Sequence, residues 1–527
     1  MAITSLWLAR ALISVSSPAN SAQARAGLNG LVAQDLRPVP FERYTMDSQL
    51  APALEPGKLK RTLSNRQIGM IAIGGVIGAG LFAGSGGVIH SAGPAVIVAY
   101  VGIGAVLVLI MRMLAELAVA SPDSGSFASY AARELGPWAG VTLSYLYMYT
   151  WMITIGYEAT AASSIMHSFV PGIAPWLWAL IFMITFTGIN LAAAKVFGEF
   201  EFWISLVKVV TIGGFILIGV LAILGFIPGF ESPGLSNFTG SFAPNGWTPV
   251  WLATVTVFFS FFGSESVTIA AAEAKDPAAA VRRAMRTVVT RILVFYVGSI
   301  AVIIALVPSG DDALLSGPYA LVFERLGLPA AAVIMSIVII TAMLSLMNSG
   351  IFVTSRMIYA AADRGELPRA LTVTNKRGVP VRAVLVASVG GFLTVGANYF
   401  VPGPDLFMFL LSSSGAIAVF VYAFIAVTQL RSRARIGKAG AKALSLKMWA
   451  HPFGGIIVLA ALASVIIALF YVEETRLSLT LSTGAAVVFT CVGFIHQKRK
   501  TLRPGAAAED SAVEDPLEPA ARPGAEY

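Results

Sequence analysis

The stretch IGGVIGAGLF, residues 73–82, carries four glycines, Gly74, Gly75, Gly78 and Gly80, inside an otherwise apolar run. Glycine weakens a helix by about 1 kcal/mol per residue relative to alanine. Backbone groups that lose their helical partners at bilayer depth are tolerated only where they line a cavity in the protein. We therefore predict a broken helix here and expect a polar solute to bind beside it.

The composition places this break in a membrane protein. Hydrophobic residues make up 57% of the 527 positions and charged residues only 12%, about half the charged fraction of a typical soluble domain. Uncharged stretches of the roughly 20 residues needed to cross a bilayer recur along the chain. We expect an all-α integral membrane protein with twelve transmembrane helices. The predicted spans are residues 68–89, 94–120, 138–166, 175–194, 200–227, 250–272, 292–307, 330–354, 383–400, 406–430, 452–471 and 477–495.

Basic residues concentrate in alternate connections between these spans. They precede span one and follow spans six, eight, ten and twelve, whereas the opposite connections hold chiefly Arg325 and Arg476. Short cytoplasmic loops collect Lys and Arg, and an even number of spans places both termini on one side. We expect a multi-pass protein of the cytoplasmic membrane with both termini in the cytoplasm. The basic loops that give the net charge of +8 then face anionic lipid, so the charge requires no nucleic-acid partner.

The two ends of the chain differ from its core. Residues 1–57 contain no span and mix Ala, Ser, Pro and Arg, and residues 501–527 are rich in Ala, Pro and Glu. Such compositions are typical of disorder. We expect a disordered cytoplasmic extension, a membrane domain over residues 58–500 and a disordered cytoplasmic tail. In an alternative interpretation, translation begins at Met46, which leaves a shorter extension.

A second broken helix is predicted in span six, where the apolar residues 251–259 run into SFFGSE at 260–265. Two interrupted helices, each opening a set of five spans, indicate an inverted-repeat transporter with its binding site near the membrane midplane. No residue-level repeat supports this pairing, which rests on the positions of the breaks. The two repeats are expected at about residues 66–227 and 248–430, followed by two peripheral helices at about 450–496.

The first break supplies groups that bind an anion. The amide N–H groups of Gly78, Ala79 and Gly80 open the half-helix that follows it, where the helix dipole favours a carboxylate. In the alternative interpretation, the glycines only permit close helix packing, as small residues do in membranes generally. For Gly74 and Gly75 the two interpretations stay equally open.

Freed carbonyl groups supply the complementary site. They lie near Ile77 in span one and near Phe259, Ser260 and Phe262 in span six, where Gly263 marks the second break. We expect them to receive an ammonium group, so that one site holds both ends of a zwitterion.

Seven segments carry a resemblance to a known family. They are IGGVIGAGLF at 73–82, SAGPA at 91–95, MRMLAELAVASPDSGSFASYA at 111–131, GEFEFWISLVKV at 198–209, FFSFFGSESVTIAAAEAKDP at 258–277, SRMIYAAADRGELP at 355–368 and SSGAIAVFVYAFIAVTQLR at 413–431. Over roughly residues 60–500 the chain resembles the amino acid-polyamine-organocation (APC) superfamily and its bacterial amino acid transporter group, most of all the γ-aminobutyrate (GABA) permeases. The resemblance implies a LeuT-like fold of five-plus-five inverted repeats and proton-driven uptake of an amino acid.

Lys208 is an ionisable residue inside span five, and such residues are costly in a bilayer and usually functional. In related permeases the lysine of this motif occupies the place where sodium-coupled relatives bind a cation, so the resemblance implies a role in proton coupling. Three interpretations stay open. Lys208 takes up and releases a proton, or it is a fixed ammonium bound to helix carbonyls, or it extends to the membrane surface.

Three glutamates also lie inside predicted spans. Glu265 directly follows the second break and either contacts the substrate ammonium through water, with a share in proton coupling, or caps the second half-helix. Glu158 lies in mid-span three, in a region that faces the site in this fold, and its charge suits a substrate amine; alternatively it is a packing carboxyl. Glu116 lies four residues after Arg112, which predicts a local helix pair rather than a substrate contact.

Aromatic and polar side chains near the breaks complete the predicted site. Phe259, Phe261 and Phe262 are candidates for a gate over the bound solute, although contact with lipid or core is the alternative for each. Ser345 and Asn348 in span eight are expected either to supply polar contacts near Lys208 or to bond only between helices.

Other classes of protein lack support in the sequence. The single cysteine, Cys491, cannot form an intramolecular disulfide, and no Cys/His spacing indicates a metal, so neither metal nor cofactor is expected. A membrane enzyme would need a nucleophile with its base, and a nutrient sensor would need a signalling domain. We predict a secondary transporter, not an enzyme, that imports a zwitterionic amino acid with protons. GABA is the leading substrate. Substrate exchange, and proline, aromatic amino acids or asparagine as substrates, are the alternatives.

Overall fold

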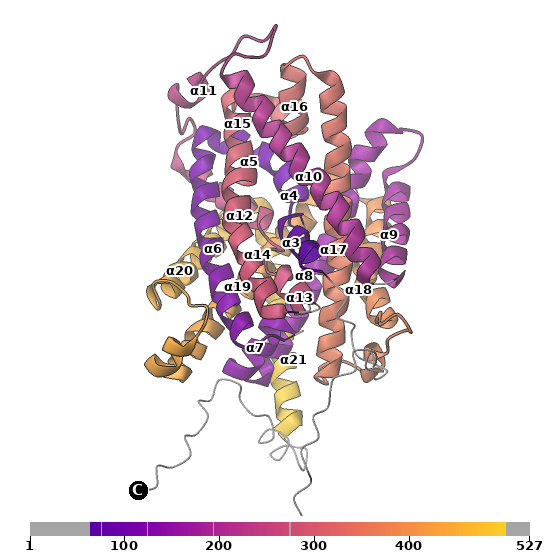
Figure 1. Ribbon diagram of the computed structural model, residues 1–527. Helices are drawn as coiled ribbons and strands as arrows, with labels where there is room; N and C mark the ends of the chain where they lie inside the picture. The colour runs from indigo at the N-terminus through magenta and orange to yellow at the C-terminus, as the bar shows by residue number, and fades with distance from the viewer. Residues whose placement is uncertain are drawn as a thin grey trace, which may run out of the picture. The chain divides into compact units, whose positions relative to one another are not determined.

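We describe the protein from a computed structural model, in which residues 64–74, 76–123, 125–192, 194–272, 274, 276–401 and 403–501 are placed (Figure 1). Within these ranges all the regular elements are helices. The N-terminal extension, the alternative start and Gly75 lie outside the described residues. So does the C-terminal tail beyond its first residue.

The helices follow the order of the predicted spans. The first half contains α3 (Asn65–Gly74), α4 (Ala79–Phe82), α5 (Gly84–Ala92), η2 (Gly93–Ala95), α6 (Val96–Ala120), α7 (Ser126–Leu135), α8 (Pro137–Phe169), α9 (Pro175–Ala192) and α10 (Ala194–Ile223). The second half contains α11 (Ser236–Thr239), α12 (Trp247–Ser260), α13 (Ser266–Ala272), α14 (Pro277–Arg291), η3 (Ile292–Gly298), α15 (Ser299–Leu306), η4 (Asp312–Leu315), α16 (Pro318–Arg325), α17 (Pro329–Asp363), η5 (Arg369–Thr372), α18 (Val381–Phe400) and α19 (Gly403–Ala443). Two further helices follow, α20 (Phe453–Tyr471) and α21 (Glu473–Thr501).

Both predicted breaks are present. The first span is divided between α3, which ends at Gly74, and α4, which begins at Ala79. The sixth span is divided between α12 and α13, and the intervening Gly263 has φ +97°. This left-handed conformation suits glycine, which has no Cβ to clash with the backbone.

The second halves of the two broken helices run to opposite ends of the helix bundle (Figure 1). α5 contacts η4 near α16, whereas α13 contacts α7. In sequence, α7 follows the second span of the first half, and η4 and α16 follow the second span of the second half. The second part of each broken helix thus contacts the segment that follows the second span of the other half. Two inverted repeats are expected to pack in this way.

α8 is the helix around which much of the bundle packs. It contacts α7, α9, α17, α18, α19 and α21. Thr150, Thr154 and Thr160 donate hydrogen bonds to carbonyls one turn earlier, at 2.8, 2.9 and 3.0 Å. These bonds satisfy the hydroxyl groups inside the helix, so that polar residues are tolerated at its buried face.

The count of twelve spans is not fully confirmed. Among the described helices, eight are long and apolar enough to cross a membrane, and Trp247–Ser260 and Val294–Leu306 are shorter apolar helices. Spans one and six are shortened by their breaks, and span seven begins with the π-helical turn η3. α8 is continuous, but its hydroxyl side chains and Glu158 make it less apolar.

Some residues expected in loops lie on helices instead. Arg282 and Arg283 belong to α14, which leads directly into span seven, and Arg433 and Arg435 belong to the extended end of α19. α10 also begins earlier than predicted, at Ala194. In each case the helix continues past its apolar part because polar residues also sustain a helix outside the bilayer core.

The predicted local pair of Arg112 with Glu116 is present only as an electrostatic interaction, because both side chains form their hydrogen bonds elsewhere. Glu116 on α6 accepts two hydrogen bonds from Arg433, at 2.7 and 2.6 Å, and one from Gln429 at 2.9 Å. Arg112 donates to the carbonyl of Lys447 at 2.7 Å. The planar groups of Glu116 and Arg433 match in a bidentate pair. This pair therefore joins α6 to α19.

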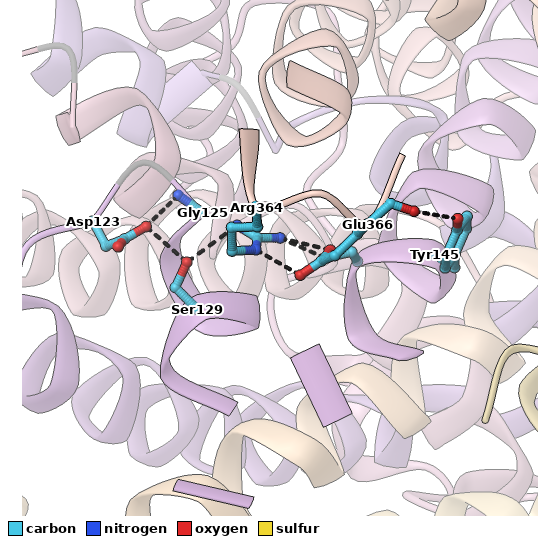
Figure 2. Close-up of polar contacts among 7 residues, drawn as sticks. Asp123, Gly125, Ser129, Tyr145, Arg364 and Glu366 are labelled. Atoms are coloured by element: carbon cyan, nitrogen blue, oxygen red, sulfur yellow. Dashed lines mark hydrogen bonds and ion pairs between the residues drawn. The ribbon is translucent and has the colours of Figure 1, made fainter. Parts of the chain in front are cut away.

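A second polar network joins the segment before α7 to the end of α17 (Figure 2). Arg364 donates to Ser129 at 3.1 Å and to Glu366 at 2.6 Å. Ser129 donates in turn to Asp123 at 2.7 Å, and Tyr145 on α8 donates to the carbonyl of Glu366 at 3.0 Å. The network holds together chain segments from both halves of the bundle.

Candidate substrate and ion site

The first break already holds a carboxylate. The amide of Ala79, the first residue of α4, donates to Oε1 and Oε2 of Glu158 at 3.1 and 3.2 Å. Gly78 is extended, with φ −147° and ψ −152°. A Cβ at Gly78 would lie 2.5 Å from Glu158 Oε1, so a side chain there would displace this carboxylate. The position thus binds a carboxylate that belongs to the protein, and binding of a substrate anion there stays a prediction.

Lys208 on α10 reaches the same break from the other side. Its Nζ donates to the carbonyl of Ile77 at 3.5 Å. It also interacts electrostatically with Glu201 and Glu158, and all three charged side chains are fully buried. The freed carbonyl of Ile77 therefore faces an ammonium group, here that of the lysine. Full burial also excludes the interpretation in which Lys208 extends to the membrane surface.

The two breaks contact each other through Ser260 and Gly80. Ser260 Oγ donates to the carbonyl of Gly80 at 2.7 Å. A Cβ on Gly80 would lie 2.9 Å from the Cα of Ser260, which requires the backbone to shift. Tyr296, in the π-helical turn η3, donates to the carbonyl of Ser260 at 2.8 Å and to that of Val76 at 3.5 Å. Peptide groups of both broken helices thus meet at one place.

Glu265 links the second break to neighbouring residues through hydrogen bonds. Its Oε1 accepts a hydrogen bond from Tyr147 at 3.0 Å, and its Oε2 accepts from Tyr422 at 2.6 Å and from the amide of Gly263 at 3.2 Å. Gly263 precedes Glu265 within the break, so this bond stabilises the break itself and is not the predicted cap on the first turn of α13, which stays a prediction. The two tyrosines also tie the break to α8 and α19.

Aromatic rings surround the second break. Phe262 lies among Tyr147, Trp151 and Tyr422, with ring centroids 6.1, 5.9 and 5.9 Å away. Phe259 packs against Gly415 of α19, where any side chain would overlap its ring.

Phe261 packs against a different pair of rings, Tyr100 and Tyr296, with centroids 6.3 and 4.4 Å away. The three phenylalanines thus contact protein rather than lipid. Their role as a gate stays a prediction.

Glu201 is a buried carboxylate that the sequence interpretation missed. Its Oε1 accepts hydrogen bonds from Ser205 at 3.1 Å and from Ser345 at 2.6 Å. Its Oε2 has no hydrogen-bond partner among the residues that the structure describes. Asn348, expected near Lys208, accepts instead from Asn190 at 2.8 Å.

A usable signal for Glu201 was present in the sequence. It lies about two helical turns before Lys208 on α10 and thus on the same face. An ionisable residue in a span is a functional candidate in its own right. Tyr147, Tyr422 and Tyr296 had no comparable signal, because tyrosine is common in membrane helices.

The site combines positive, negative and neutral polar groups in a water-poor environment. Within the described ranges, no group of three or more His, Cys, Asp or Glu residues is placed to hold a metal ion. The arrangement can bind a zwitterion through peptide groups and can hold or exchange a proton at its carboxylates. The substrate and coupling roles of the individual residues stay predictions.

Comparison with known families gives a match over most of the chain. The family model for amino acid permeases matches residues 67–500. The chain is 44% identical over 460 residues to the γ-aminobutyric acid permease of Bacillus subtilis, covering 87% of this chain and 98% of that protein. It is 43% identical over 437 residues to the γ-aminobutyric acid permease of Escherichia coli, covering 82% of this chain and 93% of that protein.

Solved structures share the fold. The crystal structure of MhsT in complex with L-phenylalanine aligns with a TM-score of 0.52 and 16% identity, over 80% of this chain and 99% of that one. This likeness confirms the LeuT-like five-plus-five arrangement. The two breaks agree with it, as do the contacts that α5 and α13 each make with elements of the opposite half.

Proposed function

Because the chain belongs to the amino acid permease family, we propose that it is a proton-coupled symporter that imports γ-aminobutyrate. We place it in the cytoplasmic membrane with both termini in the cytoplasm. Two similar relatives are named as permeases for this compound and are matched over nearly their full length. The basic ends of α14 and α19 suit the cytoplasmic side.

The observation that carries the proposal is the bond from the Ala79 amide to Glu158. It demonstrates a place at the first break where a carboxylate is bound by a peptide N–H. A substrate carboxylate has the same chemistry and benefits from the dipole of the following half-helix. We infer that it takes this place, with Gly78 and Gly80 leaving room for its approach.

The displaced Glu158 then serves the other end of the substrate. Its negative charge suits the ammonium group, and the carbonyls near Phe259, Ser260 and Phe262 supply further acceptors. GABA separates its two charged groups by three carbons, which requires a longer site than an α-amino acid. A single movement of Glu158 therefore exposes the carboxylate site and completes the ammonium site.

Proton coupling is assigned to the buried charges at the breaks. Lys208 holds the Ile77 carbonyl on one side of the first break, and Glu265 joins the second break to two neighbouring helices. Uptake of a proton by the buried groups around the breaks would alter contacts that differ between the outward-facing and inward-facing states. Without such differential contacts a proton cannot shift the equilibrium between the states.

The test is competition for labelled GABA uptake in proteoliposomes containing the purified protein. With an inwardly directed proton gradient, we expect accumulation of GABA and competition by unlabelled GABA. If proline, aromatic amino acids or asparagine compete and GABA does not, GABA is not the substrate. If internal amino acid is required and the proton gradient has no effect, the protein is an exchanger.

A further inference from the structure

We propose that Glu201 on α10 carries the transported proton and that Lys208 remains an ammonium ion throughout the cycle. The inference rests on the proton coupling proposed above and assigns the group that performs it.

The buried charges near the first break do not balance. Lys208 contributes one positive charge, and Glu201 and Glu158 contribute two negative charges when ionised; all three side chains are fully buried. An excess charge at bilayer depth costs several kcal/mol. One additional proton makes this cluster neutral, so the cluster has a place for one proton.

Among the residues that the structure describes, none of the elements packed against α10 supplies the missing positive charge, and α9 carries no titratable side chain. α17 presents Ser345, and η3 presents the hydroxyl of Tyr296, which bonds to peptide carbonyls. Arg66 of α3 pairs at 3.2 Å with Glu199, outside the cluster, and α15 carries no titratable side chain. The neutralising proton must therefore reside on one of the cluster's own carboxylates.

The hydrogen bonds distinguish Glu201 from the other buried carboxylates. Glu265 accepts bonds from two tyrosines and an amide, and Glu158 accepts a bond from the Ala79 amide. Glu201 accepts both of its bonds at Oε1, while Oε2 is without a partner among the described residues. A proton on Oε2 costs none of these bonds, whereas protonation of Glu158 or Glu265 weakens bonds that favour the carboxylate.

Lys208 is the less suitable proton carrier. Loss of its proton would leave two buried carboxylates without a cation and would weaken the bond to the Ile77 carbonyl. In the proposed step, a proton from the side of higher proton concentration forms an O–H bond at Glu201 Oε2. The same bond breaks on the other side and releases the proton, and Lys208 keeps its charge.

The first test compares Glu201→Gln with Glu199→Gln in proteoliposomes. Gln mimics a permanently protonated Glu201, so we expect exchange of labelled for unlabelled GABA to persist while accumulation driven by a proton gradient disappears. Glu199 is on the same helix but its side chain is 46% exposed, and its substitution should leave accumulation unchanged. Substrate-dependent proton uptake, followed with a pH indicator, should be lost only in Glu201→Gln.

Lys208→Arg separates the two candidate carriers, because arginine stays charged and cannot release a proton in proteins. We expect this variant to retain proton-driven accumulation at a reduced rate. Loss of accumulation in Lys208→Arg, with exchange intact and with normal accumulation in Glu201→Gln, would overturn the proposal in favour of the lysine.

A chemical measurement on the unaltered protein tests the same proposal without depending on whether the variants fold. Dicyclohexylcarbodiimide modifies protonated carboxyl groups in apolar surroundings, and we expect mass spectrometry to locate the adduct on Glu201 at low pH. Modification of Glu158 or Glu265 with Glu201 unmodified would contradict the proposal. Absence of any proton-driven uptake by the unaltered protein would instead refute the symport function itself.

Discussion

Gly80 is a residue at which the two broken helices approach each other closely. Its carbonyl accepts a bond from Ser260, and a Cβ in its place would lie 2.9 Å from the Ser260 backbone. Misplacement of reacting or binding groups by about 1 Å commonly costs on the order of a hundredfold in rate. The geometry of the site thus depends on the absence of one methyl group.

We expect Gly80→Ala to lower the initial rate of amino acid uptake by at least about tenfold, with the protein still present in the membrane. Gly87→Ala is the matched control, because a Cβ at Gly87 meets no atom within 4 Å. Uptake by Gly80→Ala at the rate of Gly87→Ala would contradict the close approach of the two breaks.

Lys208→Ala removes the only cation described in the buried cluster and its bond to the Ile77 carbonyl. We expect accumulation driven by a proton gradient to be abolished, since two carboxylates then lack their counter-ion and the first break loses a contact. Uptake measured at several external pH values provides the check. Retained pH-dependent accumulation would reject any coupling role for Lys208.

Much of the site was accessible from the sequence, and the rest was not for a physical reason. The glycines and the in-span charges mark the breaks, Lys208, Glu158 and Glu265, because each is unfavourable in a lipid-exposed helix. The bond between Glu158 and the Ala79 amide depends on the register of α8 against α4, which no local pattern encodes. Tyr147 and Tyr422 bond to Glu265 for the same long-range reason.

At the scale of elements, bidentate ion pairs fix the end of α19. Arg433 bonds to Glu116 of α6, and Arg435 donates to Glu134 of α7 from Nε and Nη2, at 3.0 Å in both cases. The side chains of Glu116 and Arg433 are only 3% and 10% exposed. Removal of one partner from a buried pair leaves an uncompensated charge and is strongly destabilising.

Arg433→Ala should therefore destabilise the protein by about 3 kcal/mol or more, seen as a lower thermal unfolding midpoint in detergent. Arg66→Ala is the control, because its pair with Glu199 is 60% and 46% exposed and such pairs contribute about 0–1 kcal/mol. Equal midpoints for the two variants would show that the Glu116 pair does not fasten α19.

The bounds of the helices could be predicted from the sequence better than the contacts between helices. Apolar runs gave most helix bounds to within a few residues, because burial in lipid requires apolar length. The hydrogen-bond partner of Glu116 was not predicted, because proximity to Arg112 along one helix was the only information available. The true partner, Arg433, follows eight spans later and is brought close only by the packing of α19 on α6.

At the scale of the whole molecule, the inverted repeat places the two loop sets on opposite sides. We expect Glu231, between α10 and α11, to face the exterior and Arg377, between α17 and α18, to face the cytoplasm. In a Cys491→Ser background, an impermeant maleimide added to intact cells should label Glu231→Cys and not Arg377→Cys. The reverse pattern would invert the proposed orientation.

Our central proposal is that peptide groups of the two broken helices bind the substrate. The direct measurement is an experimental structure determined with GABA bound. It should show the GABA carboxylate within hydrogen-bond distance of the Ala79 amide, with Glu158 displaced toward the ammonium group. Ligand density away from both breaks, or GABA bound while Glu158 still occupies the Ala79 amide, would contradict the account.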